Sequence, residues 1–146
     1  MTIRYLEEKD IDDCLALMAH VKDDFAGYEK NEFIQAMRVA IAAKDAFVIY
    51  GVDTIAGLIA FSYKNHEITF LTVNPDFRKK GIAKSLIREV MKCFRLGEML
   101  HVITFRNDDP KGKAAIACYY SCGFKDGALL EVYGYPCQKM ILRLPA

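Results

Sequence analysis

The chain has 146 residues, of which 53% are hydrophobic and 27% charged, and its formal net charge is +1. This length fits one domain over residues 1–146 with a substantial hydrophobic core, and the composition excludes an intrinsically disordered chain. The near-neutral charge argues against nucleic acid as a partner, because such binding normally requires a basic surplus.

The N-terminal residues 1–8 lack the apolar run of a signal peptide, and no segment approaches the roughly 18–20 apolar residues of a membrane span. We therefore expect no membrane association and a cytoplasmic location. The five cysteines are unevenly spaced, which favours reduced, buried thiols over a disulfide framework. Cys118 and Cys122 share a predicted helix face, but the three histidines show no matching spacing, so we expect no metal.

The first half of the chain begins with a predicted short strand over residues 3–6. Asp10 is a candidate N-cap of a first helix, and Asn31 is a candidate N-cap of a second. Polar residues and a glycine predict a break between them, over residues 21–30. The runs 46–50, 54–63 and 67–73 are rich in β-branched and aromatic residues and are separated by turn residues, which predicts an antiparallel meander.

The second half alternates helices and strands. A helix beginning after Gly81 carries an apolar stripe that reaches Phe94, and Gly97 ends it. A strand over 101–105 follows and should lie parallel to the strand 67–73, because a helix connects the two. A helix over 113–121 and strands near 129–133 and 138–144 complete the chain. The predicted fold class is α/β: a twisted, mostly antiparallel mixed sheet with one parallel pair and helices on both faces.

The loop between the third meander strand and the next helix is the most informative segment. The helix begins at Gly81 with the small residue Ala83 two positions later, and Arg78, Lys79, Lys80 and Lys84 surround this point with positive charge. Helix N-termini expose main-chain N–H groups and a partial positive charge, so this segment predicts a phosphate site. A plain helix start with a solvated basic face is the alternative. The spacing fits neither a P-loop nor a dinucleotide fingerprint.

The run Arg78-x-x-Gly81-x-Ala83, preceded by Val73-x-Pro75, resembles the acyl-CoA signature of the GNAT acetyltransferase superfamily. The segment Ala115-x-x-x-Tyr119-x-x-x-Gly123-Phe124 resembles a second segment of that family, at the expected distance. The order of the predicted elements also matches the GNAT fold. The resemblance is specific from residue 67 to residue 124 and weak before about residue 45.

The resemblance implies an N-acetyltransferase that uses acetyl-CoA as co-substrate, without a metal, and an amine of a small molecule, peptide or protein as acceptor. It implies that the main chain of Leu71, Thr72 and Val73 bonds the pantetheine arm and that N–H groups of residues 79–84 hold the pyrophosphate. The implied cofactor site comprises Leu71, Thr72, Val73, Arg78, Lys79, Lys80, Gly81, Ile82, Ala83, Lys84, Ser85, Asn107 and Tyr119.

The resemblance also assigns acid–base roles. Tyr119 occupies the family's tyrosine position and is the candidate general acid for the leaving thiolate, the alternative being that it only packs. Tyr120 points about 100° away on the helix and is expected in the core or at the surface. Glu67 is the candidate base, with His66, His101 or direct proton release to solvent as alternatives. A cysteine nucleophile would need a paired histidine, for which the sequence offers no sign.

One position departs from the family pattern. Many members carry an asparagine seven residues before the tyrosine, where this chain has Gly112, and whether Asn107 replaces it stays open. The acceptor site is implied in residues 21–32 and 131–138. The candidate acceptor residues, which a polar surface loop would also explain, are Asp23, Asp24, Phe25, Tyr28, Glu29, Glu131, Tyr133 and Tyr135. An acyl-CoA sensor without transferase activity is the alternative function, and a monomer or a homodimer is expected.

Overall fold

The structure, a computed structural model, describes residues 1–144, so the last two residues of the predicted domain lie outside the described part of the chain. The strands are β1 (Ile3–Tyr5), β2 (Ala46–Tyr50), β3 (Ile55–Ser62), β4 (Glu67–Val73), β5 (Met99–Phe105), β6 (Lys125–Val132) and β7 (Tyr135–Arg143). The α-helices are α1 (Ile11–Val21), α2 (Lys30–Ala43), α3 (Ile82–Met91) and α4 (Lys113–Ser121). Short 3-10 turns cover Glu8–Asp10, Lys22–Asp24, Pro75–Phe77 and Pro110–Gly112.

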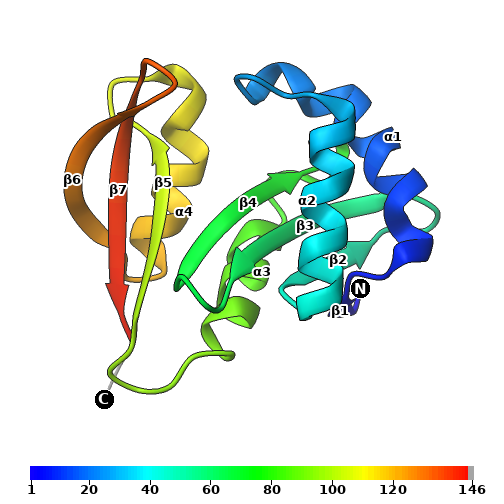
Figure 1. Ribbon diagram of the computed structural model, residues 1–146, viewed down its shortest axis with the longest axis horizontal. Helices are drawn as coiled ribbons and strands as arrows, with labels where there is room; N and C mark the ends of the chain where they lie inside the picture. Colours follow the sequence, from blue (N-terminus) through cyan, green and yellow to red (C-terminus); the bar gives the residue numbers. More distant parts are fainter. Residues whose placement is uncertain (145–146) are drawn as a thin grey trace.

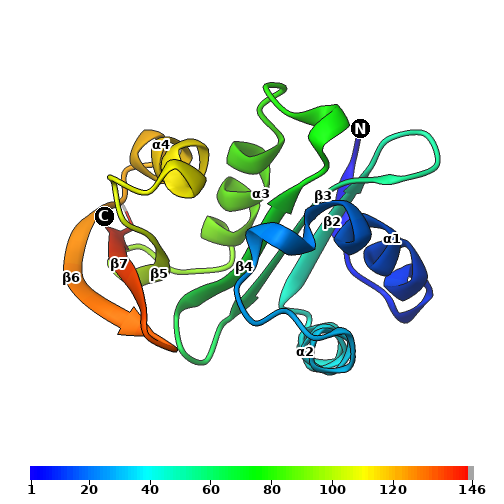
Figure 2. The same cartoon turned by 90° about the horizontal axis from the view of Figure 1, so that it is seen from above.

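The strands form one seven-stranded sheet in the order β1-β2-β3-β4-β5-β7-β6. Every neighbouring pair is antiparallel except β4 and β5, which are parallel. Figure 2 shows α1 and α2 on one side of the sheet and α3 and α4 on the other. The predicted fold class is therefore confirmed, including the single parallel pair and the helices on both faces.

Each face of the sheet carries its own hydrophobic core. The helix α3 contributes the buried residues Ile82, Leu86, Ile87 and Val90, which are the predicted stripe, to a core that α4 shares. On the opposite face, α1 and α2 cover β2 and β3. The strand β3 is buried over almost its whole length because helices cover both of its sides.

The parallel pair β4–β5 is short, and the two strands then separate. Only Glu67 with His101 and Ile68 with Val102 are paired, and Figure 1 shows β4 and β5 diverging beyond this point. A β-bulge lies at the same place: Ile68 pairs with Phe61 and Phe70 with Ala60, so Thr69 is an additional residue in β4. Bulges bend the strand that carries them, so this one directs β4 away from β5.

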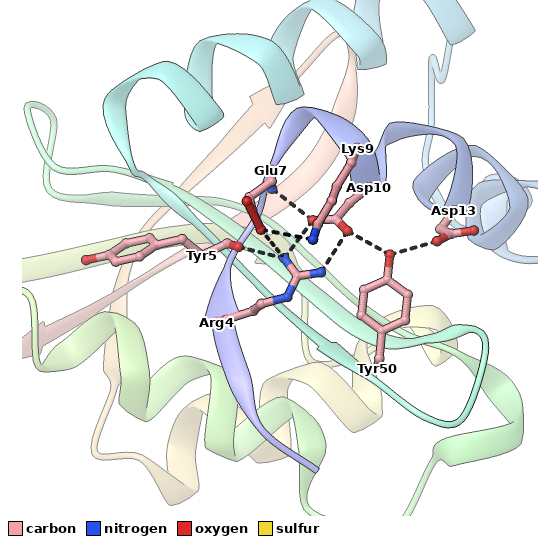
Figure 3. Close-up of polar contacts among 7 residues, drawn as sticks. All are labelled: Arg4, Tyr5, Glu7, Lys9, Asp10, Asp13 and Tyr50. Atoms are coloured by element: carbon pink, nitrogen blue, oxygen red, sulfur yellow. Dashed lines mark hydrogen bonds and ion pairs between the residues drawn. The ribbon is translucent and has the colours of Figure 1, made fainter.

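A polar cluster fixes the N-terminal strand and α1 to β2. The Arg4 guanidinium donates two hydrogen bonds of 2.8 Å to the buried Asp10 carboxylate, and the Glu7 N–H donates a third at 2.9 Å. The Tyr50 hydroxyl lies 2.9 Å from Asp10 Oδ1 and 2.8 Å from Asp13 Oδ2, so the two carboxylates share its single proton (Figure 3). Bidentate Arg–carboxylate pairs are strong and directional, so this cluster fixes where α1 begins.

Two predicted helix caps differ in the structure. Asp10 occupies the N-cap position of α1, as predicted, but its side chain does not cap the helix, because Arg4, Glu7 and Tyr50 occupy its carboxylate. Asn31 is not a cap either: α2 begins at Lys30, and the Glu29 carboxylate accepts the hydrogen bond from the Glu32 N–H at 2.6 Å.

Other boundaries also differ from those predicted. The helix α3 ends at Met91, so Phe94 and Gly97 lie in the following turn, and β6 and β7 are longer than the predicted last strands. All five cysteines are free thiols, but only Cys14 is buried, while the other four are half-buried. Within residues 1–144, no helix combines the length and the apolarity that a membrane span requires.

Asp10→Asn tests the polar cluster. Burial opposes ionisation of Asp10, but the hydrogen bonds from Arg4, Glu7 and Tyr50 outweigh it and hold the pKa of Asp10 below its ordinary value. We expect the substitution to lower the free energy of unfolding in urea at pH 7 by about 2–4 kcal/mol.

The same variant carries a pH signature. Because the folded-state pKa is depressed, this stabilisation is present above the unfolded value near ~3.9 and is lost as the pH falls through the folded value. The gap between wild type and Asp10→Asn should therefore close in acid. Glu7→Gln is the control, since Glu7 is an exposed member of the cluster and its loss should cost less than about 1 kcal/mol. Equal effects of the two substitutions would show that the Asp10 carboxylate is not the centre of the cluster.

Candidate active site

The loop between β4 and α3 is held in shape by Asn74. Its buried side chain donates to the Ile55 carbonyl at 3.1 Å and accepts from the Asp76 N–H at 3.0 Å, which anchors the loop to β3. Lys79 and Gly81 then adopt left-handed backbone conformations, with φ of 64° and 75°. Glycine reaches this region without strain, and a Cβ at Gly81 would meet nothing within 4 Å, so open space lies in front of the helix start.

The main-chain N–H groups of residues 79–84 have no hydrogen-bond partner within residues 1–144. They point out of the loop and the first turn of α3, where the helix dipole adds partial positive charge. Lys80 lies over the Phe77 ring at 5.4 Å, and Arg78 pairs with Asp24 at 3.8 Å. The loop thus combines unpaired donors with cationic side chains, which is the arrangement that binds a phosphate group.

The edge of β4 continues this site into the sheet. The Asn74 N–H bonds to Ala56 of β3, and alternate residues of a strand point the same way, so Thr72 also directs its main chain toward β3. Leu71 and Val73 therefore direct their N–H and C=O groups toward the gap that β5 leaves. Of the three predicted pantetheine contacts, Leu71 and Val73 have main-chain groups available there, whereas those of Thr72 are used within the sheet.

Tyr119 lies in the core between α4 and the sheet. It is 3% exposed and packs against the Phe124 ring with 5.3 Å between centroids. Its hydroxyl has no partner among the described residues. Burial, with smaller contributions from Cys118 and Cys122, raises the pKa of Tyr119 well above its ordinary value, so the phenol keeps its proton.

Two of the three candidate bases, Glu67 and His101, contact each other, whereas the His66 side chain has other partners. Glu67 and His101 face each other across the parallel pair, with 3.7 Å between Oε2 and Nε2, and both are about three-quarters buried. Burial lowers the pKa of His101, although the charge of Glu67 opposes this. The His66 carbonyl accepts the His101 N–H at 2.8 Å, but the His66 side chain has other partners, with Nδ1 at 2.9 Å from the Met99 carbonyl oxygen and its ring against Phe94.

The departure at Gly112 has a steric cause. A Cβ at this position would lie 2.4 Å from the Phe105 Cβ and 3.1 Å from Ile116, so an asparagine does not fit there. Asn107 is exposed and donates to the Tyr120 hydroxyl at 3.3 Å, and Tyr120 in turn donates to Asp126 at 2.6 Å. Tyr120 thus lies at the surface, one of its two predicted locations.

A cavity of about 240 Å³ lies between the α1–α2 loop and the β6–β7 turn, the two segments predicted to form the acceptor site. Its lining residues are Ala26, Gly27, Val132, Tyr133, Gly134 and Tyr135. Figure 1 shows the two segments facing each other at the end of the molecule where β4 and β5 are apart.

Three other predicted acceptor residues have contacts within the protein. Phe25 stacks on Phe70, just beyond the bulge of β4, with 4.7 Å between ring centroids. Tyr28 packs on Phe33, and Glu29 caps α2. The sequence indicated only a turn at Asp109, but its carboxylate binds the Tyr135 hydroxyl at 2.5 Å. The Asp-Pro turn gave no sign of this contact, because Tyr135 is distant in the sequence.

One family model and one curated relative match most of this chain. The model of the acetyltransferase (GNAT) family matches residues 11–124. The UPF0157 protein YqkA of Bacillus subtilis (strain 168) is 28% identical over 93% of this chain, and the match spans 38% of the length of that curated relative.

Solved structures share the fold. Ard1 from Thermoplasma volcanium superposes with a TM-score of 0.78, 19% identity and coverage of 99% of this chain and 98% of that chain. The putative acetyltransferase yncA from Salmonella typhimurium, determined with its cofactor acetyl-CoA, has a TM-score of 0.76 and 15% identity over 100% of this chain and 95% of its own. Because the family model covers most of the chain and its signature segments lie on the split strand, the loop and α4, this protein belongs to the acetyltransferase (GNAT) family.

Proposed function

We propose that this chain transfers an acetyl group from acetyl-CoA to an amine of a small molecule, peptide or protein by direct attack on the thioester. The observation that carries the proposal is the continuity of the site. The gap between β4 and β5 exposes the main chain of Leu71 and Val73 and leads to the unpaired N–H groups of residues 79–84. This geometry suits an extended amide-bearing arm that ends in a pyrophosphate.

Different residues would bind different parts of acetyl-CoA. Leu71 and Val73 would bond the pantetheine amides through the main chain, as an additional strand would. Residues 79–84 would bind the pyrophosphate through N–H groups. Arg78, Lys79, Lys80 and Lys84 would supply positive charge around it, and Ser85 closes the first turn of α3 by donating to the Gly81 carbonyl at 3.0 Å. Asn107, whose amide contacts only an exposed tyrosine, would reach the arm from the end of β5.

The chemistry forms a C–N bond, breaks the C–S bond and removes two protons from the acceptor nitrogen, one before attack and one as the intermediate collapses. Tyr119 would donate its proton to the departing thiolate and recover one from the nitrogen of the new amide, a role supported by its protonated state and by a hydroxyl that no described residue engages. Glu67, paired with His101 at the closed end of the gap, would accept the proton of the acceptor ammonium through a chain of waters, because the acceptor-side cavity lies at the open end.

Ala83→Asp tests the anion site in a way that separates binding from folding. A carboxylate in the first turn of a helix interacts favourably with the helix dipole, so the free energy of unfolding should stay the same or rise slightly. The same carboxylate repels the pyrophosphate, so the acetyl-CoA Kd measured by calorimetry should rise at least about tenfold. Ala19→Asp on the exposed surface of α1 is the control and should leave the Kd unchanged. An unchanged Kd in Ala83→Asp would place the cofactor elsewhere.

Tyr119→Phe should lower kcat by about 10²-fold or more, because the leaving thiolate loses its proton donor. The acetyl-CoA Kd and the unfolding curve should change little, since the lost hydroxyl has no partner in the described residues. CoA release measured with a thiol reagent gives kcat, and the exposed Tyr63→Phe is the matched control. If kcat is unchanged, Tyr119 serves only in packing.

Glu67→Gln should lower kcat/KM about tenfold at neutral pH, and the loss should diminish as the pH approaches the pKa of the acceptor amine. The reason is that an acceptor already neutral in solution needs no base. A loss that is equal at every pH would show that Glu67 acts through structure alone.

A further inference from the structure

The acceptor-side cavity has an uncommon lining. None of the described residues around it carries a charge, and its titratable side chains are two tyrosines, Tyr133 and Tyr135. The flanking segments 22–30 and 131–135 contain four carboxylates against two lysines. A cavity of this kind offers aromatic surface and hydrogen-bond acceptors in a negative environment, and no cation in its described lining for a ligand carboxylate.

The Tyr135 hydroxyl already donates its proton within the protein. Its hydroxyl donates to Asp109 Oδ2 at 2.5 Å, while the other carboxylate oxygen accepts the Lys111 N–H at 3.0 Å. The Phe105 ring meets the Tyr135 ring edge-on at 5.8 Å and holds its plane. A phenol whose only proton is committed in this way can only accept a hydrogen bond from a ligand. The hydrogen bond raises the pKa of Tyr135 and lowers that of Asp109, so the proton stays on the phenol.

Tyr133 is conformationally unusual. It occupies the first position of the two-residue β6–β7 turn, with a φ of 51°, followed by Gly134 at 76°. Turns of this type favour Asn or Gly at that position, and a bulky aromatic residue there is an outlier. Its side chain is fully exposed although it lines the cavity. Opposite, Gly27 has no side chain and leaves the space in front of it open.

We propose that this cavity selects acceptors whose amine has no neighbouring carboxylate, with Tyr135 accepting a hydrogen bond from the amine group and Tyr133 covering the attached carbon chain. The inference rests on the proposed function and specifies its substrate class: aliphatic and aminoacyl amines, including peptide amines, and not free amino acids. Asp109 is a positioning residue, because it acts only through the Tyr135 hydroxyl. A carboxylate beside the amine would meet no cation in the described cavity lining, and the excess of carboxylates in the flanking segments would repel it.

The test compares alanine amide with alanine, and phenylalanine amide with phenylalanine, as acceptors of the full chain. Each compound has a single amine, and the members of each pair differ only in the carboxylate. We expect kcat/KM to be at least about tenfold higher for each amide, after correction for the neutral fraction of each amine at the assay pH. Tyr135→Phe and Asp109→Asn should each lower kcat/KM for the amide several-fold, because the amine loses its positioned acceptor, while the acetyl-CoA Kd stays constant. Tyr133→Ala should raise KM for the amide with little change in kcat.

The controls are matched to these changes. Tyr5→Phe removes an exposed phenol hydroxyl on β1, and Asp53→Asn removes an exposed carboxylate in the β2–β3 turn, so both should keep the wild-type kcat/KM for the amide. Indifference of the wild type to the carboxylate, or an unchanged kcat/KM for the amide in both Tyr135→Phe and Asp109→Asn, would overturn the inference.

A binding measurement separates this inference from the proposed function. Calorimetric titration of phenylalanine amide and of phenylalanine into the CoA-saturated protein needs no turnover. If the protein binds the amide and not the acid but transfers no acetyl group, the cavity assignment stands and the transferase proposal fails. If it transfers acetyl groups but binds both ligands equally, the cavity assignment fails and the transferase proposal stands.

Discussion

The site depends on one constraint in the sheet, the short parallel contact between β4 and β5. A crossover through α3 makes these strands parallel, and only two residue pairs join them before the bulge at Thr69 turns β4 away. Main-chain donors and acceptors that a continuous sheet would pair internally are left available along the edge of β4. Because unpaired main-chain groups inside a protein are unfavourable, a ligand that pairs them is stabilised by the sheet itself.

The bulge has a second consequence for the site. It interrupts the regular alternation of side chains between the two faces of β4. Ile68 and Leu71 therefore both face the core below α3, while Phe70 faces the opposite side. There Phe70 stacks with Phe25, which fixes the α1–α2 loop beside the gap. The same distortion therefore opens the sheet and places the loop that borders the acceptor-side cavity. The Arg4–Asp10–Tyr50 cluster supports this arrangement from the other end of α1.

Charge is distributed locally in this molecule. The chain is nearly neutral overall, yet four cationic side chains lie within residues 78–84 and carboxylates predominate around the acceptor-side cavity. The Arg78–Asp24 ion pair joins these two regions, and both of its side chains are about half exposed, so it contributes little to stability. Opposite local charges at the two ends of the site suit an anionic co-substrate at one end and a cationic acceptor at the other.

The sequence by itself determined the features whose causes are local. The stripe of Ile82, Leu86, Ile87 and Val90 predicted α3, and Gly81 indicated where this helix begins, because helix periodicity and backbone freedom are properties of adjacent residues. The motif spacing also indicated the family.

Only the tertiary structure decided the rest. Asp10 was expected to cap a helix, but its partners include Tyr50, 40 residues away, and charge-assisted bonds to Arg4 outweigh a local cap. The Phe105 side chain leaves no space for a Cβ at position 112. The hydrogen bond that Tyr135 donates to Asp109 leaves its hydroxyl able only to accept one from a ligand. Such contacts follow from how the strands pair and where they separate, which depends on the packing of the whole sheet and has no signature in any one segment.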